Sequence, residues 1–274
     1  MFKYPQKPLV AAAVQLTSTP DCTENLARVQ KYLKEAKVLG ADLAVLPENF
    51  GFLGTEKEKL ALAQSIEGSS FLSRIRELAA KLDMAVVAGG MPEIGPDEDH
   101  VYNTSVFIGR GGETLGSYRK MHLFDIDLPG QITYQESLRV AAGTEPVVIP
   151  FEGWNVGLSI CYDLRFPEYY RALVDKGAHI LTIPSAFTLQ TGKDHWDILL
   201  KARAIENQCY VIAPGQFGLH LKGRISWGKT SVIGPWGTTL ALAPESEYVV
   251  VARLDPDHLK QTRQNLPCLN HRKL

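Results

Sequence analysis

The sequence predicts an α/β protein with mixed sheets, and two observations support this prediction. In the first third of the chain, short apolar runs typical of buried strands alternate with segments whose apolar residues recur at helical spacing. Further along, strand-like runs come in pairs joined by turns, with helices between the pairs. No repeat, low-complexity segment or linker interrupts the 274 residues. We therefore expect one domain over 1–274, with a loose lead-in over about 1–8 and a C-terminal tail over about 262–274.

The chain begins with two predicted strand–helix units. Leu9 to Leu16 is an apolar strand, and a helix over Glu24 to Leu39 follows it. Leu43 to Leu46 is a short strand, and Ser69 or Ser70 can cap a second helix. Later strands are expected at Met84 to Ala88, Val101 to Ile108, Glu113 to Tyr118, Val147 to Ile149, the run before Cys161, His179 to Ile183, Cys209 to Ala213, Thr230 to Ile233, Thr238 to Leu242 and Tyr248 to Leu254.

The second half of the chain holds one long loop and two further predicted helices. Lys120 to Gly143 shows no strong periodicity, and loops of this length inside a domain are often functional. A helix is expected over Phe166 to Val174 and another over His195 to Asn207. The apolar face of the second helix is predicted to consist of Ile198, Leu199, Ala202 and Ile205.

Composition excludes several classes of protein. The net charge is −1 and charges of both signs are mixed along the chain, so we expect no nucleic-acid partner. No apolar run has the length that spans a bilayer, so no membrane partner is expected. The four cysteines form no C-x-x-C pair and no dense framework, which is typical of a reduced chain. We therefore expect a cytoplasmic protein.

Three residues with catalytic potential follow predicted strands, namely Glu48, Lys120 and Cys161. Cys161 lies where a strand leads into a helix, a position that favours a thiolate and leaves backbone N–H groups free to bind an oxyanion. Taken singly, each residue also fits a purely structural role. Together they suit acyl transfer, in which Cys161 attacks, Glu48 moves the proton and Lys120 stabilises the tetrahedral intermediate.

The seven histidines offer no competing site of comparable strength. They show no H-E-x-x-H or similar metal spacing, so no metal site is expected. A histidine that approaches Cys161 only in the folded chain, as in papain-like enzymes, remains an open alternative from spacing alone.

The chain resembles the nitrilase superfamily of carbon–nitrogen hydrolases. The likeness runs from Val10 to the tail at Leu266 to Arg272, and its three blocks are Leu46 to Asn49, Tyr118 to Leu123 and the stretch around Cys161. The resemblance implies a four-layer α-β-β-α sandwich with two mixed sheets, and a catalytic triad of Glu48, Lys120 and Cys161. It also implies that Glu136 orients Lys120, that the backbone N–H of Tyr162 joins the oxyanion hole, and that no cofactor is needed. A homo-oligomer, a dimer or larger, is a further expectation from the resemblance.

Within the superfamily the chain is most similar to the branch of deaminated glutathione amidases. This likeness rests on Ser185 to Thr188, Thr191-Gly192, His195-Trp196, Lys201 to Gln208 and the strand after it. It implies a small amide substrate that carries a carboxylate, whose 2-oxoglutarate-like end would contact Arg165, Phe187 and Thr191. A guanidinium suits that task because its planar fork matches a carboxylate. The alternative for Arg165 is a structural salt bridge with Asp163 or Glu168. Lys229 and Gly234 depart from the branch pattern and put one end of the pocket in question.

Three functions remain open from the sequence. The first is an amidase that converts deaminated glutathione into 2-oxoglutarate and Cys-Gly through a thioester. The second keeps the triad but acts as an ω-amidase on 2-oxoglutaramate, as an N-carbamoyl hydrolase or as a nitrilase. The third is a binding protein without turnover, which a missing reactive thiol would favour.

Overall fold

The structure, a computed structural model, describes residues 4–128 and 132–273 and contains two mixed sheets. The sheet that we call the N-terminal sheet has the order β17 (Tyr248–Leu254), β1 (Leu9–Gln15), β2 (Leu43–Val45), β3 (Ala85–Ile94), β4 (Val101–Ile108) and β5 (Thr114–Arg119), with β8 (Val140–Ala141) beside β4. The sheet that we call the central sheet has the order β16 (Thr239–Leu242), β15 (Ser231–Ile233), β12 (Tyr210–Ala213), β11 (Ile180–Thr182), β10 (Trp154–Leu158) and β9 (Val148–Phe151).

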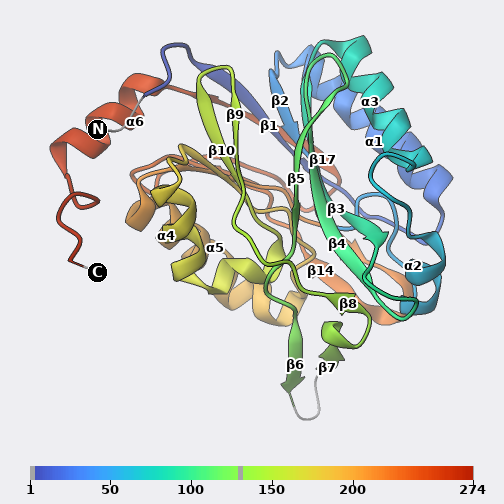
Figure 1. The fold of residues 1–274 in the computed structure, drawn as a ribbon. Helices are drawn as coiled ribbons and strands as arrows, with labels where there is room; N and C mark the ends of the chain where they lie inside the picture. Colours follow the sequence, from blue (N-terminus) through green and yellow to red (C-terminus); the bar gives the residue numbers. More distant parts are fainter. Residues whose placement is uncertain (1–3, 129–131, 274) are drawn as a thin grey trace.

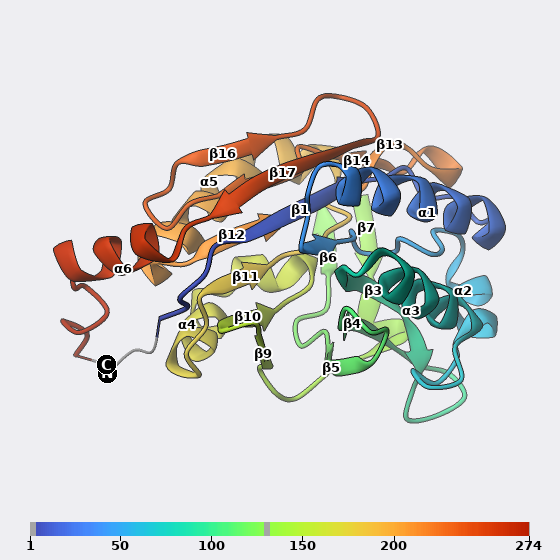
Figure 2. The same ribbon diagram turned by 90° about the horizontal axis from the view of Figure 1, so that it is seen from above.

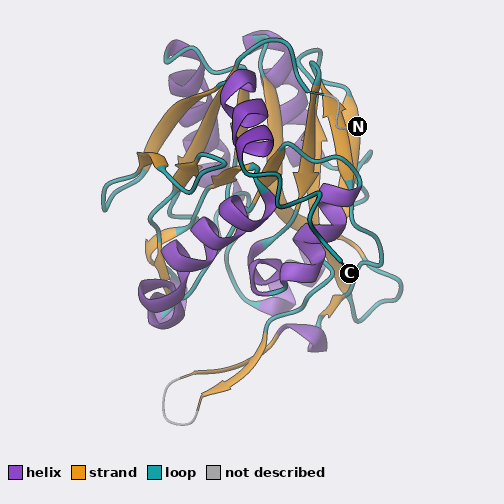
Figure 3. Cartoon of the chain, turned by 90° about the vertical axis from the view of Figure 1, so that its left-hand side faces the viewer, coloured by secondary structure: helices purple, strands orange, loops and turns teal. Residues whose placement is uncertain are grey.

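Helices cover the outer faces of both sheets, so the predicted α-β-β-α sandwich is confirmed. The outer face of the N-terminal sheet is covered by α1 (Cys22–Val38) and α3 (Ser70–Leu82), which lie side by side in Figure 2. The central sheet is covered by α4 (Pro167–Asp175) and α5 (Leu189–Asn207) (Figure 1). Figure 3 shows helices on both sides of the strands.

Alternation along β1 shows how the sequence builds these layers. Successive side chains of a strand point to opposite faces. Ala11 and Ala13 belong to the core between the two sheets, together with residues of β10, β11 and β12. Ala12 and Val14 belong to the core beneath the helices, together with Val29 of α1. A strand buried on both faces accounts for the continuous apolar run seen in the sequence.

Several elements lie close to where the sequence predicts them, although α1 begins at Cys22, two residues before the expected start. Asp21 caps α1 by accepting hydrogen bonds from the N–H groups of Thr23 and Glu24, at 2.8 and 3.0 Å. Ser69 caps α3 by accepting from the N–H of Leu72 at 3.2 Å. The predicted hairpin between β4 and β5 is present, with antiparallel pairing.

Other elements differ from the prediction. The expected long loop over Lys120 to Gly143 contains β6 (Asp125–Leu128), β7 (Ile132–Gln135), a 3₁₀ turn (Glu136–Leu138) and β8, while 129–131 lie outside the described residues. The β6–β7 hairpin extends away from the sandwich (Figures 1 and 3). Elements that the sequence did not predict are α2 (Glu56–Leu62), β13 (Phe217–Leu219), a 3₁₀ turn (Leu221–Gly223), β14 (Ile225–Trp227) and α6 (Pro256–Asn265).

The predicted face of α5 is wrong. The helix begins at Leu189, before the expected His195, and it buries Trp196, Leu200 and Arg203 instead of the apolar residues named from the pattern. Ile198 and Ile205 are 68% and 51% exposed. The buried face of α5 contains an arginine and small polar residues, so the spacing of apolar residues does not reveal it.

The two ends of the chain are more ordered than a loose lead-in and a tail suggest. The carbonyl of Lys7 accepts a hydrogen bond from Trp154 Nε1 at 3.0 Å, while residues 1–3 lie outside the description. Helix α6 includes the first residues of the expected tail, 262–265, and residue 274 is not described. No helix in the described part of the chain is long and apolar enough to cross a membrane.

Candidate active site

Glu48, Lys120 and Cys161 each follow a strand, and the sandwich brings these three strand ends together. Glu48 follows β2, Lys120 follows β5 and Cys161 follows β10. Cys161 adopts a left-handed conformation with φ of 48°, and its N–H donates to the carbonyl of Pro184 at 2.9 Å. Such a conformation costs a non-glycine residue about 1–3 kcal/mol and is concentrated at functional sites.

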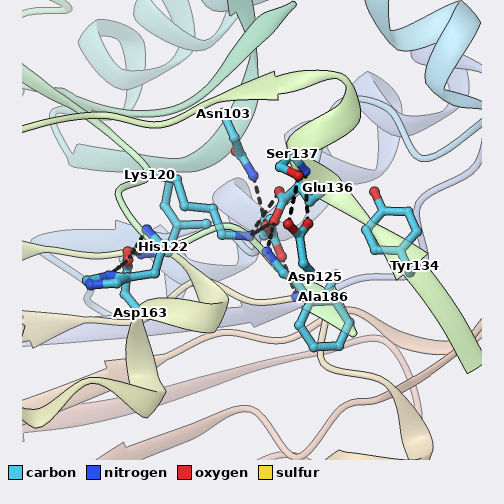
Figure 4. A network of polar contacts seen from close by, with 12 residues as sticks. Asn103, Lys120, His122, Asp125, Tyr134, Glu136, Ser137, Asp163 and Ala186 are labelled. Carbon is cyan, nitrogen blue, oxygen red and sulfur yellow. Dashed lines mark hydrogen bonds and ion pairs between the residues drawn. The ribbon is translucent and has the colours of Figure 1, made fainter. Parts of the chain in front are cut away.

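Lys120 lies between two carboxylates. Its Nζ is 2.7 Å from Glu136 Oε2 and 3.2 Å from Glu48 Oε1. The Lys120 side chain is almost fully buried, as are both glutamates. In Figure 4 the side chains of Asn103, Lys120 and Glu136 converge on one point. Buried charges of this kind are stable only when paired and hydrogen-bonded, which this arrangement provides.

Three nitrogen donors hold the carboxylate of Glu48. Asn103 Nδ2 and Lys120 Nζ donate to Oε1 at 2.8 and 3.2 Å, and the N–H of Ala186 donates to Oε2 at 2.9 Å. The carbonyl of Glu48 accepts from Gln216 Nε2 at 2.9 Å. These contacts come from both sheets and from the loop after β11, so they fix the carboxylate in one orientation.

Glu136 is positioned by the base of the β6–β7 hairpin. The N–H of Phe124 donates to Glu136 Oε2 at 2.7 Å, and the N–H of Glu136 donates to the carbonyl of Phe124 at 3.2 Å. Asp125 accepts from the N–H and the hydroxyl of Ser137 at 3.0 and 2.7 Å. The segment that was predicted to be a long loop therefore positions the carboxylate of Glu136 against Lys120.

The neighbours of each group set its charge. Burial alone would raise the pKa of Glu48, but Lys120, a hydrogen bond from the Cys161 thiol and Arg224 together hold that pKa below its ordinary value. Burial would lower the pKa of Lys120, but Glu136 and Glu48 outweigh it and raise the pKa well above its ordinary value. Glu48 is therefore a carboxylate and Lys120 an ammonium in the resting site.

Cys161 differs from the thiolate that the sequence suggested. Burial, followed by the charge of Glu48, raises the pKa of the Cys161 thiol well above its ordinary value, although Lys120 opposes this. The residue opens a 3₁₀ turn, Cys161–Arg165, and α4 begins only at Pro167, so the thiol does not lie at the start of an α-helix. The resting site thus holds a neutral thiol that donates its hydrogen bond to a carboxylate base.

The turn that carries Cys161 is fastened by the buried carboxylate of Asp163. Oδ2 accepts from Tyr118 Oη and from the N–H of Ile160, both at 2.7 Å. Oδ1 is 2.7 Å from His122 Nδ1 and accepts from the N–H of His122 at 3.1 Å. In Figure 4 the His122–Asp163 pair lies beside Lys120. Asp163 therefore ties the cysteine turn to the strand and loop that carry Lys120.

A cavity opens above the three groups. It is lined by Glu48, Asn49, Lys59, Asn103, Lys120, Phe124, Tyr134, Glu136, Cys161, Tyr162, Ala186, Phe187, Thr188, Thr191 and Arg224. We call it the inner cavity. A wider outer cavity adjoins it and shares Phe124, Tyr134, Thr188 and Arg224.

Three of the four predicted substrate contacts lie in the inner cavity, namely Tyr162, Phe187 and Thr191. Arg165 is not among the lining residues. Its guanidinium is 3.3 Å from His195 Nδ1 and packs on the rings of Phe187 and Tyr162. In the described chain it forms no ion pair with Asp163 or Glu168, so the salt-bridge alternative for Arg165 is wrong.

Several lining residues were not predicted from the sequence. Asn103 lies inside β4, where the pattern of a buried strand gave no sign of a polar role. Arg224 and Lys59 are ordinary cations of polar segments, and only the fold turns them toward the cavity. Phe124 directly precedes β6 and Tyr134 lies in β7, and the sequence did not predict this hairpin.

The structure also decides two questions that the sequence left open. No histidine lines the inner cavity, so a papain-like Cys–His pair finds no support among the described residues. Lys229 and Gly234 line neither the inner nor the outer cavity. Lys229 Nζ instead pairs with Glu245 at 3.1 Å, and Gly234 is part of the turn between β15 and β16. Within the described residues no group of three or more His, Cys, Asp or Glu side chains is placed to hold a metal ion.

Comparison with known proteins relates nearly the whole chain to carbon-nitrogen hydrolases. A model of the carbon-nitrogen hydrolase family matches residues 10–264. A deaminated glutathione amidase of Synechocystis is 46% identical over 269 residues, which cover 97% of this chain and 98% of that protein. A chloroplastic omega-amidase of Arabidopsis thaliana is 34% identical, covering 94% of this chain and 71% of that protein.

A solved structure agrees with the fold. Nit3 of Saccharomyces cerevisiae, a member of branch 10 of the nitrilase superfamily, superposes with a TM-score of 0.89 at 30% identity. The match covers 98% of this chain and 98% of Nit3.

Proposed function

The chain belongs to the carbon–nitrogen hydrolase family, and from that premise we propose that Glu48, Lys120 and Cys161 are the catalytic residues of an amidase. The observation that carries the proposal is the contact of a buried thiol with a carboxylate that is itself paired to a buried ammonium. A neutral thiol next to a fixed carboxylate is the arrangement that general-base activation of a nucleophile requires.

The first half of the reaction forms a thioester. Glu48 takes the thiol proton as Sγ of Cys161 attacks the amide carbon, and the electron pair of the carbonyl moves to its oxygen. The Lys120 ammonium and the N–H of Tyr162 stabilise this oxyanion. The first N–H groups of a helical turn have no partner within the turn, and Tyr162 is the second residue of its 3₁₀ turn. Glu48 then gives its proton to the leaving nitrogen, and the carbon–nitrogen bond breaks.

The second half hydrolyses the thioester. Glu48, again a carboxylate, takes a proton from a water molecule whose oxygen attacks the thioester carbon. The carbon–sulfur bond breaks, the proton returns to Sγ, and the acid product leaves. Glu136 acts as a positioning residue, because its two contacts with Lys120 keep the ammonium charged and aimed. No step requires a metal or an organic cofactor.

We propose deaminated glutathione as the substrate, cleaved to 2-oxoglutarate and Cys-Gly. The 46% identity to a deaminated glutathione amidase over nearly the whole chain supports this choice. The inner cavity offers an aromatic ring and a hydroxyl, Phe187 and Thr191, to the acyl group bound to Cys161. Arg165 Cζ lies 5.4 Å from the centroid of the Phe187 ring, and we propose that Arg165 contacts the carboxylate of that group.

A panel of amides assayed with wild type and Cys161→Ala tests chemistry and specificity together. We expect release of Cys-Gly and 2-oxoglutarate from deaminated glutathione, with a loss of at least about 10⁴-fold in kcat for the variant. Cys268→Ala is the matched control because Cys268 lies outside the cavity. Equal turnover by wild type and Cys161→Ala would contradict the proposal.

An ω-amidase acting on 2-oxoglutaramate is the second candidate. The Arabidopsis relative favours it, and the same catalytic residues would serve. An N-carbamoyl hydrolase or a nitrilase would also keep the triad. Ammonia as the released product, with no turnover of the dipeptide amide, would select this group of activities. No turnover of any amide in the panel by the folded wild-type protein would select a binding protein.

We also propose that the protein is a cytoplasmic homo-oligomer. An exposed apolar surface supports the oligomer, because Ile205 of α5 lies beside Gly237 of the β15–β16 turn, whose Trp236 is 57% exposed, and Ile198 of α5 is also exposed. Four free cysteines support a reducing compartment.

A further inference from the structure

Arg224 is the one cation of the inner cavity's described lining that has no carboxylate partner. Lys120 contacts Glu48 and Glu136, and Lys59 Nζ is 2.9 Å from Glu56 Oε2. No described carboxylate lies within 4 Å of the Arg224 guanidinium. Its nearest aromatic neighbour is Tyr134, whose ring centroid is 5.8 Å from Arg224 Cζ. A guanidinium that lines a substrate cavity and forms no ion pair within 4 Å can receive an anion from the substrate, although its charge also acts on the more distant Glu48 and Glu56.

The backbone around Arg224 is built to hold this side chain at the cavity. The N–H of His220 donates to the carbonyl of Arg224 at 2.7 Å, which closes the β13–β14 hairpin. His220 Nε2 is 3.0 Å from Ser226 Oγ, and Ser226 forms a β-bridge with Thr188. Arg224 therefore lies over the loop that also carries the lining residues Phe187 and Thr188.

The place of Arg224 between the two cavities indicates which part of the substrate it contacts. Cys161 lines only the inner cavity, so an acyl group bound to its sulfur must stay there. Arg224 lines both cavities, so a group that extends from the inner cavity into the outer one would pass it. A leaving amine that extends by two residues from the scissile nitrogen would carry its terminal carboxylate toward Arg224.

We propose that Arg224 binds the terminal carboxylate of the leaving dipeptide and so selects peptide-like amides over simple ones. This inference rests on the proposed function. It assigns the two arginines of the site to different ends of the substrate, with Arg165 beside the acyl group and Arg224 at the amine. An ω-amidase substrate has ammonia as its leaving group, which carries no carboxylate for Arg224 to bind.

The test compares Arg224→Gln with wild type on three substrates: deaminated glutathione, the same compound with its terminal carboxylate converted to a primary amide, and 2-oxoglutaramate. We expect Arg224→Gln to lower kcat/KM for deaminated glutathione by roughly 10–100-fold, mainly through KM. For the other two substrates the change should stay within about threefold. Wild type should itself lose a similar factor when the carboxylate is masked, and the two losses should not add.

Further variants separate binding from damage to the fold. Arg224→Lys should recover part of the affinity, because it keeps the charge but loses the bidentate geometry. Arg74→Gln, on the exposed surface of α3, should match wild type on every substrate. Equal losses on all three substrates, or no loss on any, would overturn the role of Arg224 while leaving the proposed function intact. Failure of wild type to cleave deaminated glutathione would overturn the proposed function, and the role of Arg224 with it.

Discussion

At the scale of single residues, the proposed mechanism depends on one proton that passes between the Cys161 thiol and the Glu48 carboxylate. Burial raises the pKa of the Cys161 thiol. Burial would also raise the pKa of Glu48, but Lys120 and the hydrogen bond from the thiol outweigh it and keep that pKa low. The Cys161 sulfur therefore carries the proton, and the ionised Glu48 can accept it. The nucleophile is generated during attack, which protects the thiol from unwanted reactions before a substrate arrives.

This arrangement predicts a broad pH plateau. As pH falls, activity should fade only when Glu48 takes up a proton, which occurs below its ordinary pKa of 4.5. As pH rises, ionisation of Cys161 should begin only well above its ordinary pKa of 9.0. We therefore expect kcat/KM for an uncharged amide to be flat from about pH 6 to about pH 8.5.

The rate of Cys161 alkylation by iodoacetamide, followed by peptide mass mapping, checks the same point without turnover. The alkylation rate of Cys161 should still be rising at pH 9. Cys268 in the same sample serves as the internal reference thiol. A midpoint between pH 6 and 8 for Cys161 would show a resting thiolate and contradict the account.

The residues that the sequence could predict are those whose neighbours in the chain reveal them. Glu48 and Cys161 follow short apolar strands, so their place at strand ends is visible locally. Asn103 is hidden inside an apolar strand, and Arg224 lies in a polar hairpin far from the other site residues in sequence. Only the packing of the two sheets brings these side chains to the cavity, and no local pattern encodes that packing.

At the scale of elements, the 3₁₀ turn that carries Cys161 depends on Asp163. The Asp163 carboxylate accepts all of its hydrogen bonds, so an amide in its place would set an N–H₂ group against at least one of the donors. We predict that Asp163→Asn costs about 1–3 kcal/mol of unfolding free energy and lowers kcat, because Cys161 and Lys120 lose their shared support.

Urea unfolding and steady-state assays measure the two effects of Asp163→Asn. Asp194→Asn is the matched control, because Asp194 is exposed on α5. Unchanged kcat in a destabilised Asp163→Asn protein would mean that the turn is not what aligns the nucleophile.

A second element depends on close backbone approach. Gly89 lies where the register of β3 shifts against β4, and a Cβ added there would lie 1.9 Å from the carbonyl oxygen of Leu46. Gly89→Ala must therefore displace the segment that leads into Glu48. We predict a loss of about 1–3 kcal/mol in stability together with reduced activity.

Thermal unfolding of Gly89→Ala and of Gly234→Ala provides the comparison. A Cβ at Gly234 would meet its nearest neighbours at 3.7 Å, which is ordinary contact, so this variant should unfold like wild type. Equal melting temperatures for the two variants would refute the steric explanation.

The elements that escaped prediction share a physical cause. Helix α2 buries none of its residues and is held by a capping box, so it has no apolar face to detect. Helix α5 was predicted, but its buried face was not, because it buries Arg203 and Asn207 and exposes isoleucines. By contrast, α3 buries Leu72, Ile75 and Leu78 in regular spacing, and its position agrees with the prediction.

At the scale of the whole molecule, the sandwich leaves one outer surface apolar. Ile198 and Ile205 of α5 face solvent, and Ile205 abuts Gly237 in the turn before β16, whose Leu242 is 54% exposed. We predict that Ile205→Glu shifts the protein toward smaller species in sedimentation velocity, because it places a charge in the interface of the proposed oligomer.

Ile94→Glu is the matched control for Ile205→Glu. Ile94 is 56% exposed at the far end of β3, so its variant should sediment like wild type. A wild-type protein that is monomeric at every concentration tested would contradict the proposed oligomer.

The central claim is that Cys161 carries the acyl group during turnover, and intact-protein mass spectrometry of an acid-quenched reaction tests it most directly. With deaminated glutathione, we predict a species heavier than the free enzyme by the 2-oxoglutaryl group, mapped by peptide analysis to Cys161 and missing from Cys161→Ala. Turnover by Cys161→Ala, or an acyl group attached to any other residue, would contradict the account.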